Sequence, residues 1–573
     1  MRKILALILI AAGLTLTITG CAGSGSATDT TNATEPKNTT EATETKNATT
    51  DEPVKIDLTN PPSKFDLRNA GGKNYVTPVK YQSHGDCWTF AMAGAAETAY
   101  LYANELGVPA GEKNEQVNFS EKFITWYMFH GMTKDDVVKG KVRASQVGEG
   151  FDPKEAEEAD KMAAYSFGGP FVSAANLFGC GFGPIDESAE INGEYPYAYD
   201  AEASVEWQLP LNAEYRSAPV AALFKDSRVL PTPSKIDADG NYAFNQEGVD
   251  AIKKEICQGH GVIVALNAAH PGFNNPNRAV YDNSGDEPNH AVLVVGYDDD
   301  FPKDKFTRKK KSSGEAVEGT TPPANGAIII KNSWGFQTYD GDPDDGYFYI
   351  SYYDTGLLAA LSYAFDNSRE AKHTMRNYDQ YDLMMTMWYG VTDYKDETKM
   401  ANVFEAEEDE TLYQIEYRTA YPDAEVSYEI YKDVTNDDPS SGTLLEKGVF
   451  SHQYAGSHII DLKNEHALKK GDRYSVVLTM KRGEQYAEVF PYSTAFQEGM
   501  TVNGIINKGE SFLYANGKWS DMTEAKDSLL ERAYAQCAKN LASDKSVPHI
   551  ELDKKTFTVD NYPIKAISAP NGK

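Results

Sequence analysis

Residues 82–90 read QSHGDCWTF, and this stretch decides how the rest of the chain is interpreted. Cys87 lies between an acidic residue and a tryptophan, and the run FAMAGAAETAYLYANE that follows predicts a helix. A cysteine at the start of a helix faces the positive end of the peptide dipoles, which lowers the pKa of a thiol. Most lone cysteines are buried and inert. Cys87 is therefore a candidate nucleophile only if a base accompanies it.

Two later segments supply the polar side chains that such a thiol needs. Residues 289–297 read NHAVLVVGY, in which His290 opens an apolar run of the strand type. Residues 326–335 read GAIIIKNSWG, in which a second apolar run leads to Asn332 and Trp334. An imidazole can accept the thiol proton, an asparagine carbonyl can fix its tautomer, and a tryptophan can shield that bond from water. The pattern favours nucleophilic catalysis over a packing role for the cysteine.

Four motifs in order resemble the papain-like cysteine peptidases in their bacterial form with insertions. The motifs are PPSKFDLRN, VTPVKYQSHGDCWTF, NHAVLVVGYDDDF, and IIIKNSWG followed by GYFYISY. The resemblance covers roughly residues 63–365 and implies an α+β fold of two subdomains. It also implies that Cys87 is the nucleophile, His290 is its base and later acid, Asn332 orients the imidazole, and Trp334 covers it.

The resemblance implies further roles close to the substrate. Gln82 would place its side-chain amide beside the backbone N–H of Cys87 and form an oxyanion hole. Gly168 and Gly169, in YSFGGPF, resemble the glycine pair whose backbone binds an extended peptide. Gln82 and Cys87 are one residue closer than in the usual family pattern. His290 lies farther along the chain than the roughly 130–150 residues of the papain type, so surface insertions are expected.

The N-terminus has the pattern of a bacterial lipoprotein. A short basic segment is followed by ILALILIAAGLTLTI and then by small residues that lead into Cys21. A plain secretory signal and a membrane anchor are the alternatives, but the apolar stretch is short for a span. Residues 22–62 are rich in Thr, Asn and Glu, so they predict a disordered tether and no folded inhibitory propeptide. These features place the protein outside the cytoplasmic membrane, anchored by lipid on Cys21.

Charge and cysteine usage exclude several kinds of partner. The 55 basic and 85 acidic residues give a net charge of -30, which argues against a nucleic-acid partner. The cysteines other than Cys21 show neither a CxxC pair nor metal-site spacing, so no disulfide scaffold, metal or cofactor is predicted. A bridge between Cys180 and Cys257 stays open, and Cys537 has the helical spacing of a buried residue. The acidic turn at 340–345 lacks a full calcium loop and is predicted to be solvated.

From about residue 366 the pattern changes to short alternating runs separated by turns, which predicts an antiparallel β-sandwich. The segments GESFLYANGKWSDM and NYPIKAIS resemble the lectin-like β-domain that follows the peptidase in some bacterial members. A helix is expected over 523–543. The aromatic side chains of Trp388, Tyr389 and Trp519 are assigned to the core, while a carbohydrate or other surface ligand of this domain stays open.

The sequence therefore predicts an α+β papain-like peptidase of two subdomains followed by an antiparallel β-sandwich. The predicted segments are a lipoprotein signal peptide (1–21), a disordered tether (22–62), a peptidase domain (63–365) and a lectin-like domain with a helical insertion (366–573). The predicted function is hydrolysis of peptide or protein substrates by a cysteine endopeptidase through a thiolate and an acyl-enzyme. The alternative is a catalytically silent surface-binding or adhesion protein that uses the C-terminal domain.

Overall fold

The computed structural model describes residues 56–571 with internal gaps. The signal peptide, Cys21, residues 22–55 and Gly168 of the sequence predictions lie outside the described residues. The gaps are at 129, 138–142, 152–168, 170, 192, 200–212, 237–241, 287, 311, 336–337, 340–341, 344, 367–373, 380–388, 436–437, 494–501 and 544–551.

Residues 63–365, predicted to be the peptidase and called the peptidase region below, are built on strands that are apolar on both faces. At its centre is β10 (His290–Asp298), which pairs antiparallel with β8 (Val262–Leu266) and with β11 (Ala327–Lys331). Every residue of β8 and β11 is buried, as expected for β-branched runs that are covered on both sides. The first residue of β10, His290, lies opposite Leu266 at the strand end. The polar residues at the ends of these runs, His290 at the start of β10 and Asn332 after β11, therefore lie where the apolar core ends.

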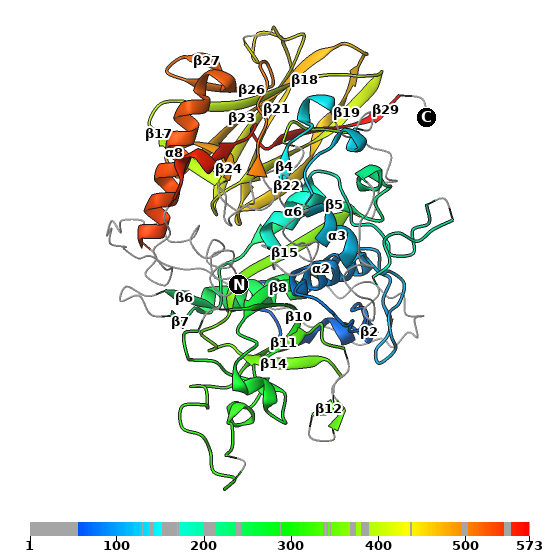
Figure 1. The fold of residues 1–573 in the computed structure, drawn as a ribbon, viewed down its shortest axis with the longest axis vertical. Helices are drawn as coiled ribbons and strands as arrows, with labels where there is room; N and C mark the ends of the chain where they lie inside the picture. The colour runs from blue at the N-terminus through cyan, green and yellow to red at the C-terminus, as the bar shows by residue number, and fades with distance from the viewer. Residues whose placement is uncertain are drawn as a thin grey trace, which may run out of the picture.

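Helices cover one side of these strands. The helix α2 (Cys87–Ala103) packs against β10 and β15 (Leu358–Asp366) and is contacted by α3 (Glu121–Met128) and α6 (Phe171–Gly179) (Figure 1). Its small residues allow this close approach, because a Cβ at Gly94 would lie 3.0 Å from the side chain of Leu293. The start of α2 is thereby held at the edge of the sheet, next to the start of β10.

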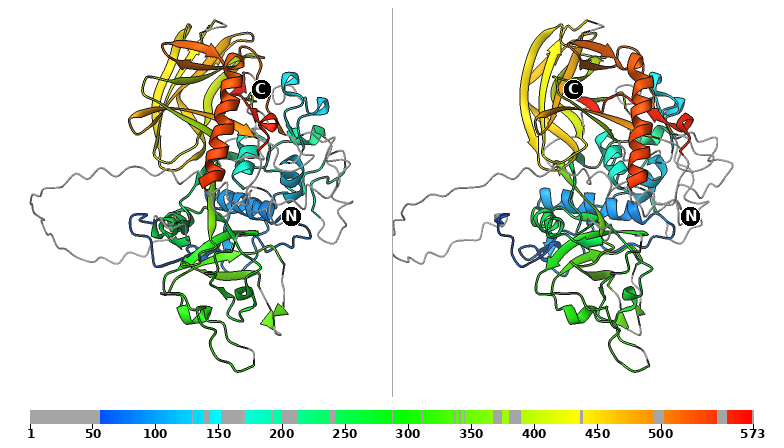
Figure 2. Two further views of the ribbon diagram at one scale, coloured as in Figure 1. Left: turned by 60° about the vertical axis from the view of Figure 1, so that its left-hand side comes forward. Right: turned by 90° about the vertical axis from the view of Figure 1, so that its left-hand side faces the viewer.

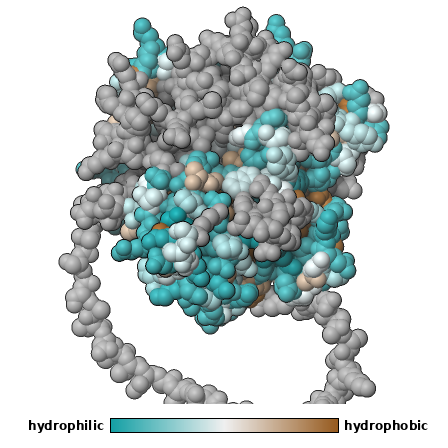
Figure 3. Space-filling model, turned by 60° about the horizontal axis from the view of Figure 1, so that its bottom comes forward, coloured by the Kyte–Doolittle hydropathy of each residue, from teal (hydrophilic) through white to brown (hydrophobic). Residues whose placement is uncertain are grey.

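Other peptidase elements extend this framework. A fourth helix, α7, spans Gln246–Cys257, and β15 pairs with both β8 and β5. The remaining strands of this region are β1 (Lys64–Asp66), β2 (Lys73–Asn74), β3 (Val108–Pro109), β4 (Gly150–Phe151), β5 (Leu223–Val229), β6 (Ser234–Ile236), β7 (Tyr242–Phe244), β9 (Ala279–Val280), β12 (Thr338–Tyr339), β13 (Asp342–Pro343) and β14 (Tyr347–Ser351). The described face of this region in Figure 3 is mostly hydrophilic with scattered hydrophobic spots, in keeping with the acidic composition.

The C-terminal region is strand-rich, and its strands form two sheets with a shared apolar core, except for β25, which pairs with β4 of the preceding region. Leu412, Tyr417, Val426 and Val476 are fully buried in that core. The long helix α8 (Met522–Ser543) lies alongside the strands (Figure 2), where the sequence predicted a helix over 523–543. The strands are β16 (Thr374–Arg376), β17 (Tyr389–Tyr394), β18 (Lys399–Glu405), β19 (Glu410–Thr419), β20 (Ala424–Lys432), β21 (Thr443–His452), β22 (Gly456–Leu468), β23 (Arg473–Arg482), β24 (Gln485–Ser493), β25 (Val502–Asn503), β26 (Ser511–Ala515), β27 (Lys518–Asp521), β28 (Thr558–Val559) and β29 (Ile564–Pro570).

One sheet of 12 strands runs through both regions, because β5 of the peptidase pairs with β22 of the C-terminal region. The backbone N–H of Val229 donates to the carbonyl of Ala455 at 2.8 Å, and the N–H of Ser457 donates to Ser227 Oγ at 2.9 Å. Gly456 permits this approach, since a Cβ there would lie 1.9 Å from the carbonyl oxygen of Ser227. The two regions therefore share backbone hydrogen bonds as well as a surface.

Buried charges also lie at this junction. Lys565 Nζ donates to Glu416 at 2.8 Å and lies 3.7 Å from Asp379, and all three side chains are fully buried. The thiol of Cys180 donates to the carbonyl of Asp379 at 3.6 Å. Removing one member of such a set would leave an uncompensated buried charge. The junction is therefore a specific polar interface.

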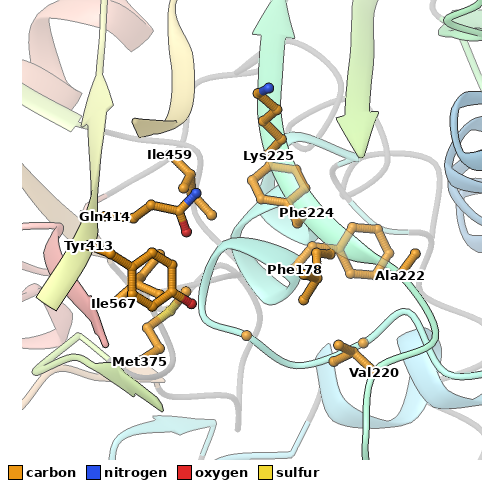
Figure 4. A pocket seen from close by; sticks show the side chains of 13 residues that line it. Phe178, Val220, Ala222, Phe224, Lys225, Met375, Tyr413, Gln414, Ile459 and Ile567 are labelled. Atoms are coloured by element: carbon orange, nitrogen blue, oxygen red, sulfur yellow. The ribbon is translucent and has the colours of Figure 1, made fainter. Parts of the chain in front are cut away.

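A small hollow beside the junction is lined by both regions (Figure 4). Phe178 and Phe224 face it from the peptidase, and Met375 and Ile459 face it from the C-terminal strands. Its volume of about 30 Å³ is room for a water molecule and not for an organic ligand. The hollow is therefore a packing gap of the junction.

Several sequence expectations bear on this framework. Cys180 and Cys257 are both free, so the open question of a bridge between them is answered in the negative. Residues 56–62, predicted as the end of the tether, lie on the peptidase, where Tyr297 donates to the carbonyl of Pro62 at 2.8 Å. Ile56 packs on the same core. No helix within the described residues is long and apolar enough to cross a membrane.

Candidate active site

The thiol of Cys87 lies where α2 begins and β10 begins. The backbone N–H of Ala291 donates to Cys87 Sγ at 3.4 Å, so the start of β10, which carries His290, lies beside the thiol. Cys87 is partly exposed, in contrast to Cys180, Cys257 and Cys537, which are buried. Among the described cysteines, Cys87 therefore combines access to solvent with a neighbouring base.

The imidazole of His290 is oriented by Asn332. His290 Nε2 and Asn332 Oδ1 are 2.7 Å apart, and Oδ1 also accepts the backbone N–H of Ser333 at 2.8 Å. A backbone N–H can only donate, so this atom of the amide is the oxygen and not the nitrogen. Nε2 must then carry the hydrogen in the neutral ring. Nδ1 is left as the acceptor for the thiol proton.

Trp334 covers this hydrogen bond. Its ring stacks on the imidazole of His290, with ring centroids 4.8 Å apart and planes inclined by 22°. Phe273 packs on the other part of the indole, with centroids 5.8 Å apart. Because water is kept from the bond between His290 and Asn332, the bond is stronger than it would be in solvent.

Gln82 is fixed beside the site by the segment that carries Asn332. Its backbone N–H donates to the carbonyl of Ser333 at 2.8 Å, and its Oε1 accepts from the hydroxyl of Ser333 at 2.6 Å. Its Nε2 donates to the carbonyl of His84 at 2.8 Å, which uses one of the two amide hydrogens. Ser333 was missed in the sequence, although it stands between two residues that were chosen.

The structure also locates part of the predicted substrate-binding backbone. Gly169 lies directly on Trp88, the residue after Cys87, since a Cβ there would be 2.4 Å from the indole ring. Only glycine permits this approach. Gly169 is therefore close to the start of α2, whereas Gly168 lies outside the described residues.

Burial shifts the pKa of Cys87 and of His290 so that each group, taken alone, favours its uncharged form. It raises the pKa of Cys87 to about 11 and lowers that of His290 to about 4, and the hydrogen bond from Asn332 acts in the opposite direction on His290. The sequence analysis expected the start of α2 to lower the pKa of the Cys87 thiol. Burial outweighs this effect and raises that pKa instead. When the proton moves from sulfur to Nδ1, the two charges form together and their attraction offsets much of the desolvation. The site thus favours the neutral pair or the ion pair over either lone charge.

A buried set of charges supports the site from behind, and the sequence analysis did not identify it. Lys80 Nζ lies 2.7 Å from Glu121 and 3.3 Å from Glu97, while Lys331 Nζ donates to Thr77 Oγ1 at 2.9 Å. Lys331 directly precedes Asn332, and Lys80 lies two residues before Gln82. These pairs tie both segments to α2 and α3. A signal was present, because a lysine ends the otherwise apolar run IIIK.

The remaining predicted features have other roles. Asp345 of the acidic turn is paired with Arg278, while 340, 341 and 344 are outside the described residues. The described residues contain no cluster of three His, Cys, Asp or Glu side chains that could hold a metal. The indole N–H of Trp519 donates to Ser440 Oγ at 3.0 Å, which is a packing role. Trp388 lies outside the described residues, and nothing is described of the Tyr389 side chain.

Comparisons with known proteins agree with this geometry. The model of the papain family cysteine protease matches residues 184–365, and that of the lectin-like domain matches residues 377–535. The first match contains His290 and Asn332 but begins after Cys87, so the thiol is assigned by its place in the structure. Cysteine proteinase 2 of Dictyostelium discoideum is 26% identical over 283 residues, or 46% of this chain. The chain spans 57% of the length of that relative.

Solved structures extend the likeness over both regions. The cysteine protease and lectin-like domains of Cwp84, a surface layer associated protein of Clostridium difficile, give a TM-score of 0.56 at 18% identity. This match covers 89% of the present chain and 90% of that one. A second Cwp84 structure, after propeptide cleavage, gives a TM-score of 0.55 at 18% identity and covers 89% of this chain and 100% of that chain. The present chain thus combines a papain-family cysteine peptidase domain with a C-terminal lectin-like domain.

Proposed function

We propose that this protein is a cysteine endopeptidase that hydrolyses peptide bonds through an acyl-enzyme on Cys87. The observation that carries the proposal is the meeting of three segments: the start of α2, the start of β10 and the end of β11. There the thiol is 3.4 Å from the N–H of Ala291, and His290 is held by Asn332 at 2.7 Å. A nucleophile, a base and an orienting group are the parts that such a reaction needs.

The first half of the reaction forms a thioester. His290 Nδ1 takes the proton of Cys87, and the thiolate attacks the peptide carbonyl carbon. The negative charge that develops on the carbonyl oxygen is stabilised by the N–H of Cys87, which has no helical acceptor, and by the second amide hydrogen of Gln82. When the carbon–nitrogen bond breaks, the imidazolium gives its proton to the leaving amine.

The second half of the reaction regenerates the enzyme. A water molecule replaces the leaving peptide, gives a proton to His290 Nδ1 and attacks the thioester carbonyl. The tetrahedral intermediate then expels the thiolate and releases the acid product. The imidazolium and the thiolate remain as the pair with which a new cycle begins.

A thiol-directed epoxide that mimics a peptide tests this proposal. Intact-mass analysis should show one addition on the full chain, peptide mapping should place it on Cys87, and cleavage of a protein substrate should stop. Cys87→Ala should show neither labelling nor cleavage. Cys257→Ser is the matched control, because its buried thiol bonds to Tyr297 and lies outside the site; it should keep both. Unlabelled Cys87 in an inactive protein would favour the adhesion alternative.

The proposal extends to where the enzyme works. The apolar stretch before Cys21 supports anchoring outside the cytoplasmic membrane by lipid on that cysteine. Metabolic labelling with an alkyne fatty acid in a bacterial host should mark the wild type and not Cys21→Ser, and the variant should leave the membrane fraction. Equal labelling of both proteins would contradict this part of the proposal.

The proposal also gives the C-terminal domain a carbohydrate or other surface ligand, which the match to the lectin-like family supports. The indole N–H of Trp519 is bonded to Ser440 Oγ, which leaves its partly exposed ring face as the part that could contact such a ligand. Binding of the Cys87→Ala protein to a glycan array, or to isolated cell-wall polymer, tests this part. Absence of binding to both would contradict it.

A further inference from the structure

The inference concerns Tyr81 and rests on the peptidase activity proposed above. Tyr81 is 52% exposed, and the described residues leave few other large apolar side chains so open to solvent. It directly precedes Gln82, which belongs to the active site. Exposure of one ring alone indicates nothing, so its place relative to the active-site residues decides what it can do.

The backbone places Tyr81 opposite Trp334. The N–H of Gln82 donates to the carbonyl of Ser333 at 2.8 Å, and the N–H of Gly335 donates to the carbonyl of Lys80 at 3.0 Å. These two bonds flank an antiparallel pair that is not itself hydrogen-bonded. In such a pair the two side chains lie on the same face and closest together.

The neighbouring glycine leaves room for this ring. Gly335 has a φ of +67°, and a Cβ there would lie 3.3 Å from the Cβ of Tyr81 and 3.4 Å from its ring. Tyr81 therefore packs along the backbone that follows Trp334. Trp334 in turn stacks on His290. Tyr81 and Trp334 thus continue, on one face, from the imidazole toward solvent.

The chemistry says which part of a substrate meets this face. His290 must give its proton to the leaving amine, so the leaving peptide passes on the imidazole side of the sulfur. Gly169 lies on Trp88, the residue after Cys87. The proposed thioester on Cys87 holds the acyl half of the substrate at this side. Side chains that continue outward from His290 therefore meet residues after the scissile bond.

We propose that Tyr81, together with Trp334, forms an aromatic surface that binds a large apolar side chain within the first two residues after the scissile bond. Tyr81 is then a specificity-determining residue and not a catalytic one. Its phenol oxygen has no part in the contact, because the ring face supplies the apolar area.

Two classes of substrate test this assignment. Internally quenched peptides share one acyl-side sequence and carry Phe, Leu, Ala or Asp at the first or second position after the bond. Methyl esters of the same acyl sequence release only methanol and place no ring there. The wild type should cleave the Phe or Leu peptides about tenfold faster in kcat/KM than the Ala peptide, as one aromatic contact supplies.

Tyr81→Ala should bring this ratio close to one and leave hydrolysis of the methyl ester unchanged, while Tyr81→Phe keeps the ratio. Tyr514→Ala, which removes a partly exposed ring from β26 of the C-terminal domain, is the matched control and should keep the ratio. A wild type without preference, an unaltered ratio in Tyr81→Ala, or an equal loss on both substrate classes would overturn the inference. A wild type that cleaves neither class would instead contradict the proposed peptidase activity.

Discussion

Replacing Asn332 isolates the group that orients the imidazole. Asn332 Oδ1 accepts from His290 Nε2 at 2.7 Å, and in the ion pair this bond is made by a charged donor. Such a bond contributes about 1.5–3 kcal/mol. Asn332→Ala should therefore lower kcat/KM by about 10- to 150-fold, since each 1.4 kcal/mol is a factor of ten.

The pH dependence gives a readout that a general loss of structure would not move. Burial already lowers the pKa of His290 to about 4, and the bond to Asn332 opposes that shift. Its loss lowers the pKa further, so the imidazolium form disappears at lower pH and the alkaline limb of kcat/KM moves down by about one unit or more. Asn332→Asp keeps both acceptor contacts and adds a negative charge, which should move the same limb upward.

The assay is the pH profile of kcat/KM on an aminocoumarin amide, with the rate of Cys87 alkylation by iodoacetamide measured over the same range. Both variants should unfold within a few degrees of the wild type. Alkaline limbs that coincide in all three proteins would refute the role assigned to Asn332, whatever the loss of rate.

Three further predictions concern stability. Burial raises the pKa of Asp86 to about 7, so between about pH 4 and pH 7 this carboxyl is ionised in the unfolded chain but protonated in the folded one, and stability falls as the pH rises through that range. Asp86→Asn should therefore stabilise the protein by up to about 4 kcal/mol at pH 8 and little at pH 4, measured by urea unfolding. Lys565→Met removes the buried cation that lies closest to Glu416 and leaves Arg418 as its remaining charged partner, so it should cost about 3–5 kcal/mol in the same assay, and a smaller loss than 1 kcal/mol would contradict a buried pair. Gly456→Ala should destabilise by about 2 kcal/mol or more, because its Cβ meets the carbonyl of Ser227, and an unchanged melting temperature would show that the junction differs.

The sequence predicted the segments around the thiol because their signals are local. A continuous apolar run with a polar residue at one end predicts both the strand and the place where that polar side chain emerges: His290 begins its run and Asn332 follows its run. In these two strands the pattern that forms the element also locates the polar group. The alternation after residue 366 predicted the β-rich domain, because that signal is local too.

The junction could not be predicted, because it depends on partners that are distant in sequence. The strand β5 reads LFKDSRV and is only partly buried, so nothing in it indicates pairing with β22, more than 200 residues later. The charge of Lys565 is likewise matched by residues from other strands. Ser333 was overlooked because its contacts with Gln82 exist only after the two segments meet.

The shared sheet has a consequence for how the enzyme meets its targets. A peptidase domain joined by a flexible linker would sample many orientations relative to the C-terminal domain. Here hydrogen bonds from Val229 and Ser457 cross the boundary, so the C-terminal domain fixes the orientation of the active-site residues relative to itself. For the proposed peptidase, a surface that binds the C-terminal domain would thereby determine, through orientation and distance, which peptide bonds can approach Cys87.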